Sequence, residues 1–115
     1  MVKKEPTRVK ENLHGCTGPV YFHDILTKDE LMGHANLFGH IVIPPQSGIG
    51  WHVHQHETEP YFILKGHGIF TNPDGSEVEV SEGDVCTIEV GEGHAIRNAS
   101  ETEDLEFIAL IVKEG

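Results

Sequence analysis

Short strand-like runs of apolar residues recur along most of the chain. They cover residues 18–26, 35–43, 51–55, 59–64, 67–71, 77–80, 84–89, 94–98 and 105–112. Sequences typical of turns separate several of these runs: PDG at residues 73–75, SEGD at 81–84 and GEG at 91–93. Many short strands at this spacing predict one compact all-β domain, a sandwich or a barrel.

Two segments depart from this rhythm. Residues 27–33 predict a short helical turn, because Thr27 and Glu30 have the spacing of a capping box and Gly33 suits the left-handed position that ends a helix. Residues 1–12 carry mixed charge without periodicity, so we expect them to be loose or ordered only by a partner. The chain is therefore divided into an N-terminal arm, residues 1–14, and a single domain, residues 15–115.

Composition narrows the class of protein. A length of 115 residues suits one domain, and the net charge of −11 argues against sequence-independent binding of nucleic acid. No apolar run approaches the ~18 residues of a membrane span, and the first 15 residues lack the apolar core of a signal peptide. Cys16 and Cys86 are too few for a disulfide framework. We expect a cytoplasmic protein with reduced thiols and with neither a nucleic-acid nor a membrane partner.

The densest polar cluster lies in GWHVHQHETEPYFILKG, residues 50–66. His52 and His54 are two residues apart, so in a strand their side chains project from the same face. Glu59 follows a short bend and can face back toward them. Two imidazoles and one carboxylate are metal ligands of borderline hardness. From these residues alone, a metal site and a solvated polar loop both remain open.

A second segment, GDVCTIEVGEGHAIRN at residues 83–98, contains two glycine turns followed by His94 and Asn98. Together the two segments resemble the two conserved motifs of the cupin superfamily. The first motif corresponds to His52, His54, Glu59 and Gly66, and the second to Gly83, Gly91, His94 and Asn98. Two positions depart from the usual pattern: Gln46 stands where the first motif opens with glycine, and Glu89 stands where the second has proline.

The resemblance implies a cupin double-stranded β-helix, a jelly-roll barrel with the site inside. It also implies that His52, His54, Glu59 and His94 bind one divalent transition metal ion per chain, with manganese, iron, nickel, cobalt and zinc all compatible. We expect His56 to lie at the rim of the barrel and His40 to have a hydrogen-bonded structural role.

The strand that follows Glu59 predicts part of the cavity wall. Tyr61 and Ile63 share the face of Glu59 and should point inward, whereas Phe62 and Leu64 should point outward. Tyr61 is the candidate catalytic residue, as a hydrogen-bond donor or a proton relay, with an ordinary barrel-filling aromatic as the alternative. The runs at 35–43 and 105–112 are apolar on both faces, which favours a homodimer.

These features favour a small metalloenzyme that acts on a small polar molecule, as an oxygenase, a decarboxylase or an isomerase. A non-catalytic binding or sensing cupin and a barrel with a purely structural metal remain alternatives. Oxalate decarboxylation is disfavoured, because a dianionic substrate requires a cation in the pocket. Arg97 has the parity opposite to His94 and points away, and Arg8 could reach the pocket only through an ordered N-terminal arm.

Overall fold

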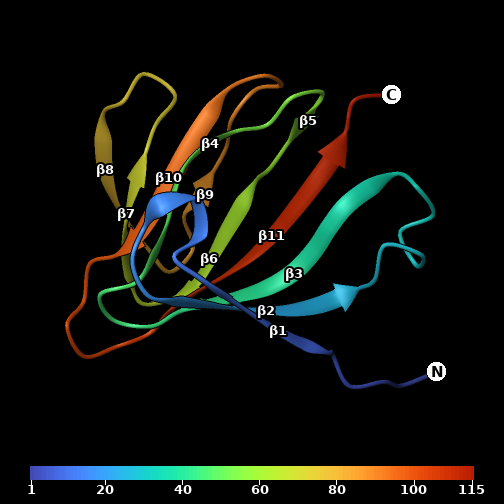
Figure 1. Ribbon diagram of the computed structural model, residues 1–115, viewed down its shortest axis with the longest axis horizontal. Coiled ribbons are helices and arrows are strands. Elements are labelled where there is room, and N and C mark those ends of the chain that lie inside the picture. Colours follow the sequence, from blue (N-terminus) through green and yellow to red (C-terminus); the bar gives the residue numbers. More distant parts are fainter.

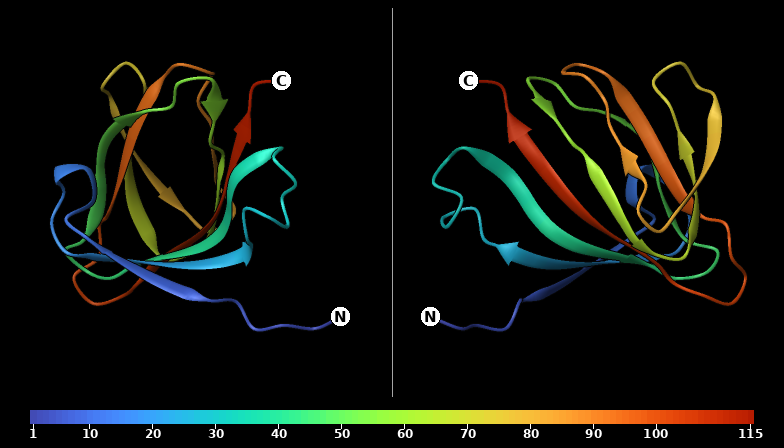
Figure 2. Two further views of the ribbon diagram at one scale, coloured as in Figure 1. Left: turned by 45° about the vertical axis from the view of Figure 1, so that its right-hand side comes forward. Right: turned by 180° about the vertical axis from the view of Figure 1, so that it is seen from behind.

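Two antiparallel sheets face each other in the computed structural model, which describes residues 1–115 (Figures 1 and 2). The larger sheet has the strand order β1 (Thr7–Glu11), β2 (Pro19–Leu26), β3 (Ala35–Ile43), β11 (Leu105–Lys113), β6 (Tyr61–Lys65) and β9 (Val85–Cys86), and β5 (Glu57–Thr58) pairs with β11. The smaller sheet has the order β4 (Gly48–Val53), β10 (Gly93–Asn98), β7 (His67–Thr71) and β8 (Glu77–Ser81). This is the all-β jelly-roll architecture that the sequence predicts.

The core lies between the two sheets and follows from the alternation of each strand. In β3 every odd-numbered residue is buried. In β6, Tyr61 and Ile63 are buried while Phe62 keeps 46% of its surface exposed, as the parity of this strand predicts. The fully buried aliphatic and aromatic side chains include Val20, Ile41, Ile43, Ile63, Ile96, Leu105 and Phe107. The cavity that contains the site opens between these same faces.

The N-terminal residues differ from the expectation. Thr7–Glu11 form strand β1, which pairs antiparallel with β2 and is the edge of the larger sheet. Pro6 accepts a backbone hydrogen bond from Asp24, and Lys3 forms an ion pair with Glu30. The prediction that residues 1–12 are loose or ordered only by a partner is therefore wrong. Hydrophobic periodicity gave no sign of β1, because the residues on its inner face are charged.

The predicted helical turn at residues 27–33 forms as a single turn, with Leu31 N donating to the Thr27 carbonyl at 3.0 Å, and continues no further. The capping box forms, with Thr27 N donating to Glu30 Oε1 at 3.0 Å and Glu30 N donating to Thr27 Oγ1 at 3.3 Å. Met32 and Gly33 then adopt consecutive positive φ angles of 54° and 77°, so the segment closes as turns instead of a helix.

The short helix of this fold lies elsewhere, at η1 (Leu13–Gly15), which is of the 3-10 type. It packs against β4 beside the cavity (Figure 2, left). No helix in the protein has the length and apolar character needed to cross a lipid bilayer.

Candidate metal centre

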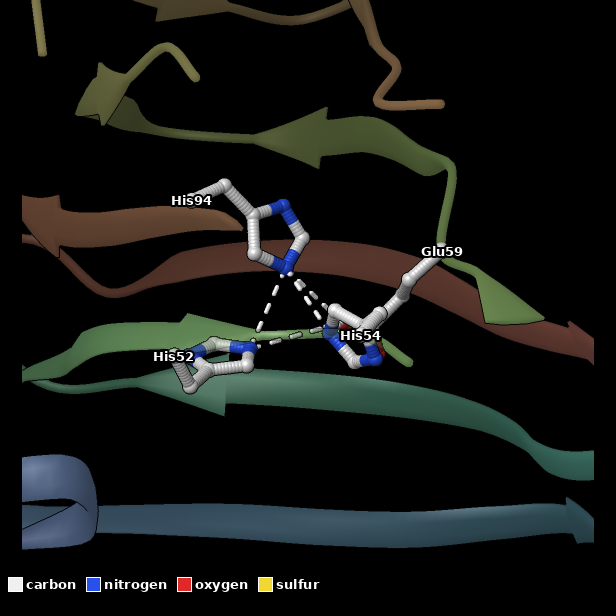
Figure 3. A group of neighbouring side chains, drawn as sticks. All are labelled: His52, His54, Glu59 and His94. Carbon is white, nitrogen blue, oxygen red and sulfur yellow. Dashed lines mark hydrogen bonds and ion pairs between the residues drawn. The ribbon is translucent and has the colours of Figure 1, made fainter. Parts of the chain in front are cut away.

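The four predicted ligands come together from three parts of the fold (Figure 3). His52 lies on β4 directly opposite His94 on β10, so their side chains share one face of the smaller sheet. His54 follows the end of β4, where its backbone exchanges hydrogen bonds with residues 91 and 92 of the turn before β10. Glu59 lies between β5 and β6 and brings its carboxylate in from the larger sheet.

The spacing of the ligand atoms fits a single ion. His94 Nε2 lies 3.1 Å from His52 Nε2, 3.1 Å from His54 Nε2 and 3.1 Å from Glu59 Oε1. All four ligand atoms lie within 4.8 Å of one another. Adjacent ligands of a six-coordinate ion at ~2.1 Å are separated by ~3 Å, so the cluster has the dimensions of one coordination shell.

Hydrogen bonds on the far side of two rings turn their Nε2 lone pairs inward. His52 Nδ1 donates to the Gly50 carbonyl at 2.7 Å, and His54 Nδ1 donates to Glu57 Oε2 at 2.5 Å. A carboxylate or carbonyl on the outer nitrogen is the usual support of a metal-bound histidine. With Nδ1 as the donor in His52 and His54, their Nε2 lone pairs point toward His94 Nε2 and Glu59, an arrangement that could hold a divalent cation.

Packing, in place of a hydrogen bond, orients His94. Its ring is fully buried, and Nδ1 has no hydrogen-bond partner. The ring stacks on Tyr61 at a centroid distance of 5.0 Å, and Phe70 meets it edge-on at 5.7 Å. Phe70 thus closes the wall behind the ligand cluster.

The pKa directions favour metal binding at Glu59 and His94, whereas at His54 a metal ion has to compete with a proton. Burial raises the pKa of Glu59, but hydrogen bonds from His52, His54 and His94 outweigh it and hold this pKa well below its usual range. Burial lowers the pKa of His94. For His54 burial also lowers the pKa, yet the hydrogen bonds to Glu59 and Glu57 raise it more. An ionised carboxylate beside a neutral imidazole is the protonation state that a metal ion requires.

Tyr61 lies against the ligands. Its hydroxyl donates to Glu59 Oε1 at 3.1 Å and lies 3.4 Å from His94 Nε2. Burial raises the pKa of Tyr61 well above its ordinary value, so the phenol keeps its proton. The structure therefore makes this residue a hydrogen-bond donor to a predicted ligand, and its catalytic role stays a prediction.

Two further histidines that the sequence singled out lie away from the cluster. The side chain of His56 is exposed and faces Glu114, with Nδ1 3.3 Å from its carboxylate. His40 Nε2 forms a hydrogen bond to Glu106 at 2.8 Å, on the side of β3 opposite its buried positions.

The cluster lines a cavity of about 230 Å³, which is small beside the ~300–1,000 Å³ of sites for drug-sized ligands. His52, His54, Glu59 and Tyr61 form one side of it. Arg8, Lys10 and His14 also line the cavity. The sequence placed Arg8 there only on the condition of an ordered N-terminal arm, and it gave Lys10 and His14 no role. The two-residue spacing of Arg8 and Lys10 was the signal that could have placed Lys10 beside Arg8.

His14 is the member of this group that contacts a predicted ligand. Its ring stacks on His52 with centroids 4.3 Å apart and planes inclined by 16°. Burial lowers the pKa of His14, and the positive charges of His52, His54 and Lys10 lower it further. η1 thus covers one side of the predicted ligand cluster with the ring of His14.

Comparison with known proteins defines the class. Residues 39–111, more than half of the chain, match the family model described as the cupin domain. With its double-stranded β-helix and its three histidines and one glutamate, the chain belongs to the cupin family.

Three of the similar proteins and solved structures come from Thermotoga maritima. An oxalate-binding protein is 40% identical over 107 residues, which is 93% of this chain and 86% of the relative. The crystal structure of a predicted oxalate decarboxylase superposes with a TM-score of 0.90 at 36% identity, covering 98% of each chain. A cupin-like protein of the same organism has a TM-score of 0.75 at 18% identity, covers 99% of this chain and 80% of its own, and is similar in fold alone.

Proposed function

We propose that the protein binds a small carboxylate, with oxalate as the candidate ligand, through one divalent transition metal ion held by His52, His54, Glu59 and His94. The observation that carries this proposal is the cavity itself, which three of the four predicted ligands line together with two cations, Arg8 and Lys10. Oxalate was disfavoured on the sequence because no cation could reach the pocket without an ordered N-terminal arm. Strand β1 supplies that arm, and the name of the 40% identical relative supports the same ligand.

The chemistry of the ligand set suits a chelating dianion. When bound, the ion supplies a Lewis acid, and one carboxylate among four protein ligands leaves it a net positive charge. Four protein ligands also leave two positions of a six-coordinate ion, the number that a dicarboxylate occupies by chelation. Glu59 is the one carboxylate that lines the cavity, and its hydrogen bonds to the imidazoles and to Tyr61 keep it turned away from an incoming anion.

Turnover is the second candidate, and one contact favours it. A decarboxylation has to deliver a proton to the carbon that loses carbon dioxide, and the protonated phenol of Tyr61 lies beside the ligand cluster. The phenol already donates to Glu59, so binding without turnover is the function that the geometry supports better. Release of formate from oxalate by the metal-loaded protein, and its loss in Tyr61→Phe, would establish turnover instead.

The metal is tested first. Purified protein should hold about one divalent ion per chain, and His94→Ala should lose most of it. His56→Ala is the matched control, because it removes an imidazole two residues from His54 but outside the cluster. Loading with metal should raise the melting temperature by about 10 °C over chelator-treated protein, when the free ion concentration is ~100 times the dissociation constant. Full occupancy in His94→Ala would mean that the ligand set is wrong.

The carboxylate is tested next, by isothermal titration calorimetry of the metal-loaded protein with oxalate. Binding should be saturable at one oxalate per chain and absent from His94→Ala. Binding of equal strength to chelator-treated protein would show that the metal is not part of the carboxylate site.

A further inference from the structure

Strand β1 reverses the usual distribution of polar and apolar side chains. Arg8 is paired with Phe22 and Lys10 with Val20, and these two partners face the core. Directly opposite residues of an antiparallel pair share a face, so Arg8 and Lys10 both point to the inner side of the sheet. Val9, between them, points outward and keeps 51% of its surface exposed. A strand selected for packing alone would place the valine inward and the cations outward.

The two cations are not equivalent, because Arg8 already has an anionic partner. Its Nε donates to Asp24 Oδ2 at 2.8 Å and its Nη2 donates to Asp24 Oδ1 at 2.9 Å, a two-point contact with one carboxylate. The guanidinium also lies over the ring of Phe22, 5.1 Å from the centroid. Arg8 therefore anchors β1 to β2 along the cavity wall, and Asp24 neutralises its charge.

Lys10 forms none of the protein's side-chain ion pairs, although acidic residues outnumber basic ones by 19 to 8. It lines the same cavity as His52, His54 and Glu59. A lysine on the inner face of a sheet, within an acidic protein and without a carboxylate partner, leaves its ammonium group available to an anion in the cavity.

We infer that the ammonium group of Lys10 pairs with the carboxylate oxygens of the bound ligand that face away from the metal ligands. This inference rests on the proposed function, since it assigns the residue that distinguishes a dianion from a monoanion at that same site. Strand β1 is then the selectivity element of the cavity: Arg8 fixes the strand and Lys10 contacts the ligand.

The experiment compares two ligands of one shape, oxalate and its monoanionic amide analogue oxamate, by calorimetry on metal-loaded protein. Lys10→Met keeps the aliphatic stem of the side chain and removes the charge. It should weaken the affinity for oxalate about tenfold or more. The same variant should weaken the affinity for oxamate less. Lys10→Arg should restore the preference for oxalate over oxamate. Lys65→Met changes the net charge equally at the end of β6, outside the cavity, and should leave both affinities unchanged.

The outcomes separate this inference from the function on which it rests. If the wild-type protein binds no oxalate, the proposed function fails and the role of Lys10 fails with it. If the wild type binds oxalate and Lys10→Met binds it as well as Lys65→Met does, the role of Lys10 alone is overturned. Metal content is measured for every variant, and loss of metal from Lys10→Met would mark a structural role and overturn the inference too. A loss of oxalate affinity confined to Arg8→Met would assign the ligand contact to Arg8.

Discussion

Glu57 lies outside the predicted ligand set and contacts one of its members, His54. One carboxylate oxygen accepts the hydrogen bond of His54 Nδ1 at 2.5 Å, and the other accepts from Asn36 Nδ2 at 3.0 Å. The half-buried carboxylate is therefore fixed from both sides, and it fixes the ring of His54 in turn. Such a contact raises the basicity of the imidazole toward a metal.

Replacement of Glu57 by Gln keeps the shape of this contact and removes its charge. We expect Glu57→Gln to lower metal affinity about 10- to 100-fold, measured by competition with a chromophoric chelator. Glu114→Gln is the control, because Glu114 faces the exposed His56 and not a predicted ligand. Equal affinities in the two variants would exclude a role for Glu57 in metal binding.

At the scale of single residues, the sequence predicted the positions that obey a local rule. His52 and His54 share a strand face, and the motif spacing added Glu59 and His94 to them. The cavity residues Lys10 and His14 depend instead on the register of β1 with β2 and on the packing of η1 on β4. Such contacts between distant segments leave no hydrophobic periodicity in the chain. The local turn at Gln46 is a separate case. Gln46 stands where the motif has glycine, yet its φ is 64°, so the turn keeps the left-handed conformation.

At the scale of elements, the alternation of apolar residues predicted the strands from β2 to β11 apart from β5, because these strands bury one face against the core. β1 buries no side chain, and all five of its residues are exposed. Strand β1 is held in place by its backbone hydrogen bonds to β2 and by the contact of Arg8 with Asp24. A pattern of apolar residues reveals neither of these interactions. The strand that brings two cations to the cavity was therefore the one that the apolar pattern did not predict.

The contact between η1 and β4 provides a test at this scale. A Cβ atom on Gly50 would lie 1.9 Å from the carbonyl oxygen of His14, so Gly50→Ala should push η1 away from β4. We expect a loss of about 1–3 kcal/mol in the free energy of unfolding, together with weaker binding of oxalate. Denaturant titration and calorimetry measure the two effects, and hydrogen exchange of residues 7–15 should accelerate.

Gly39→Ala is the control for this variant. Its Cβ would lie 3.3 Å from the nearest atom, the end of the flexible Leu37 side chain, and far from η1. If Gly50→Ala left exchange in residues 7–15 as slow as Gly39→Ala does, η1 would not depend on close approach to β4.

At the scale of the whole molecule, several apolar side chains lie exposed on the outer face of the larger sheet, away from the core. Phe62 lies opposite Val85 on one side and Ile108 on the other, and all three face outward. Phe62 and Val85 keep 46% and 62% of their surfaces exposed, and Leu64, on the same face of β6, keeps 36%. Exposed apolar residues gathered in a patch on one face in this way favour an interaction surface.

We expect this patch to join two copies of the chain, as the doubly apolar strands of the sequence predict. Light scattering after size exclusion should give about twice the chain mass of 12.7 kDa, independent of concentration in the micromolar range. Phe62→Lys places a charge at the centre of the patch and should yield a monomer, because an unpaired charge is costly to bury. Val90→Lys, at an exposed apolar residue in the turn before β10, should remain a dimer. A wild-type protein of single-chain mass at every concentration would contradict this assembly, and a Phe62→Lys dimer would move the interface to another face of the barrel.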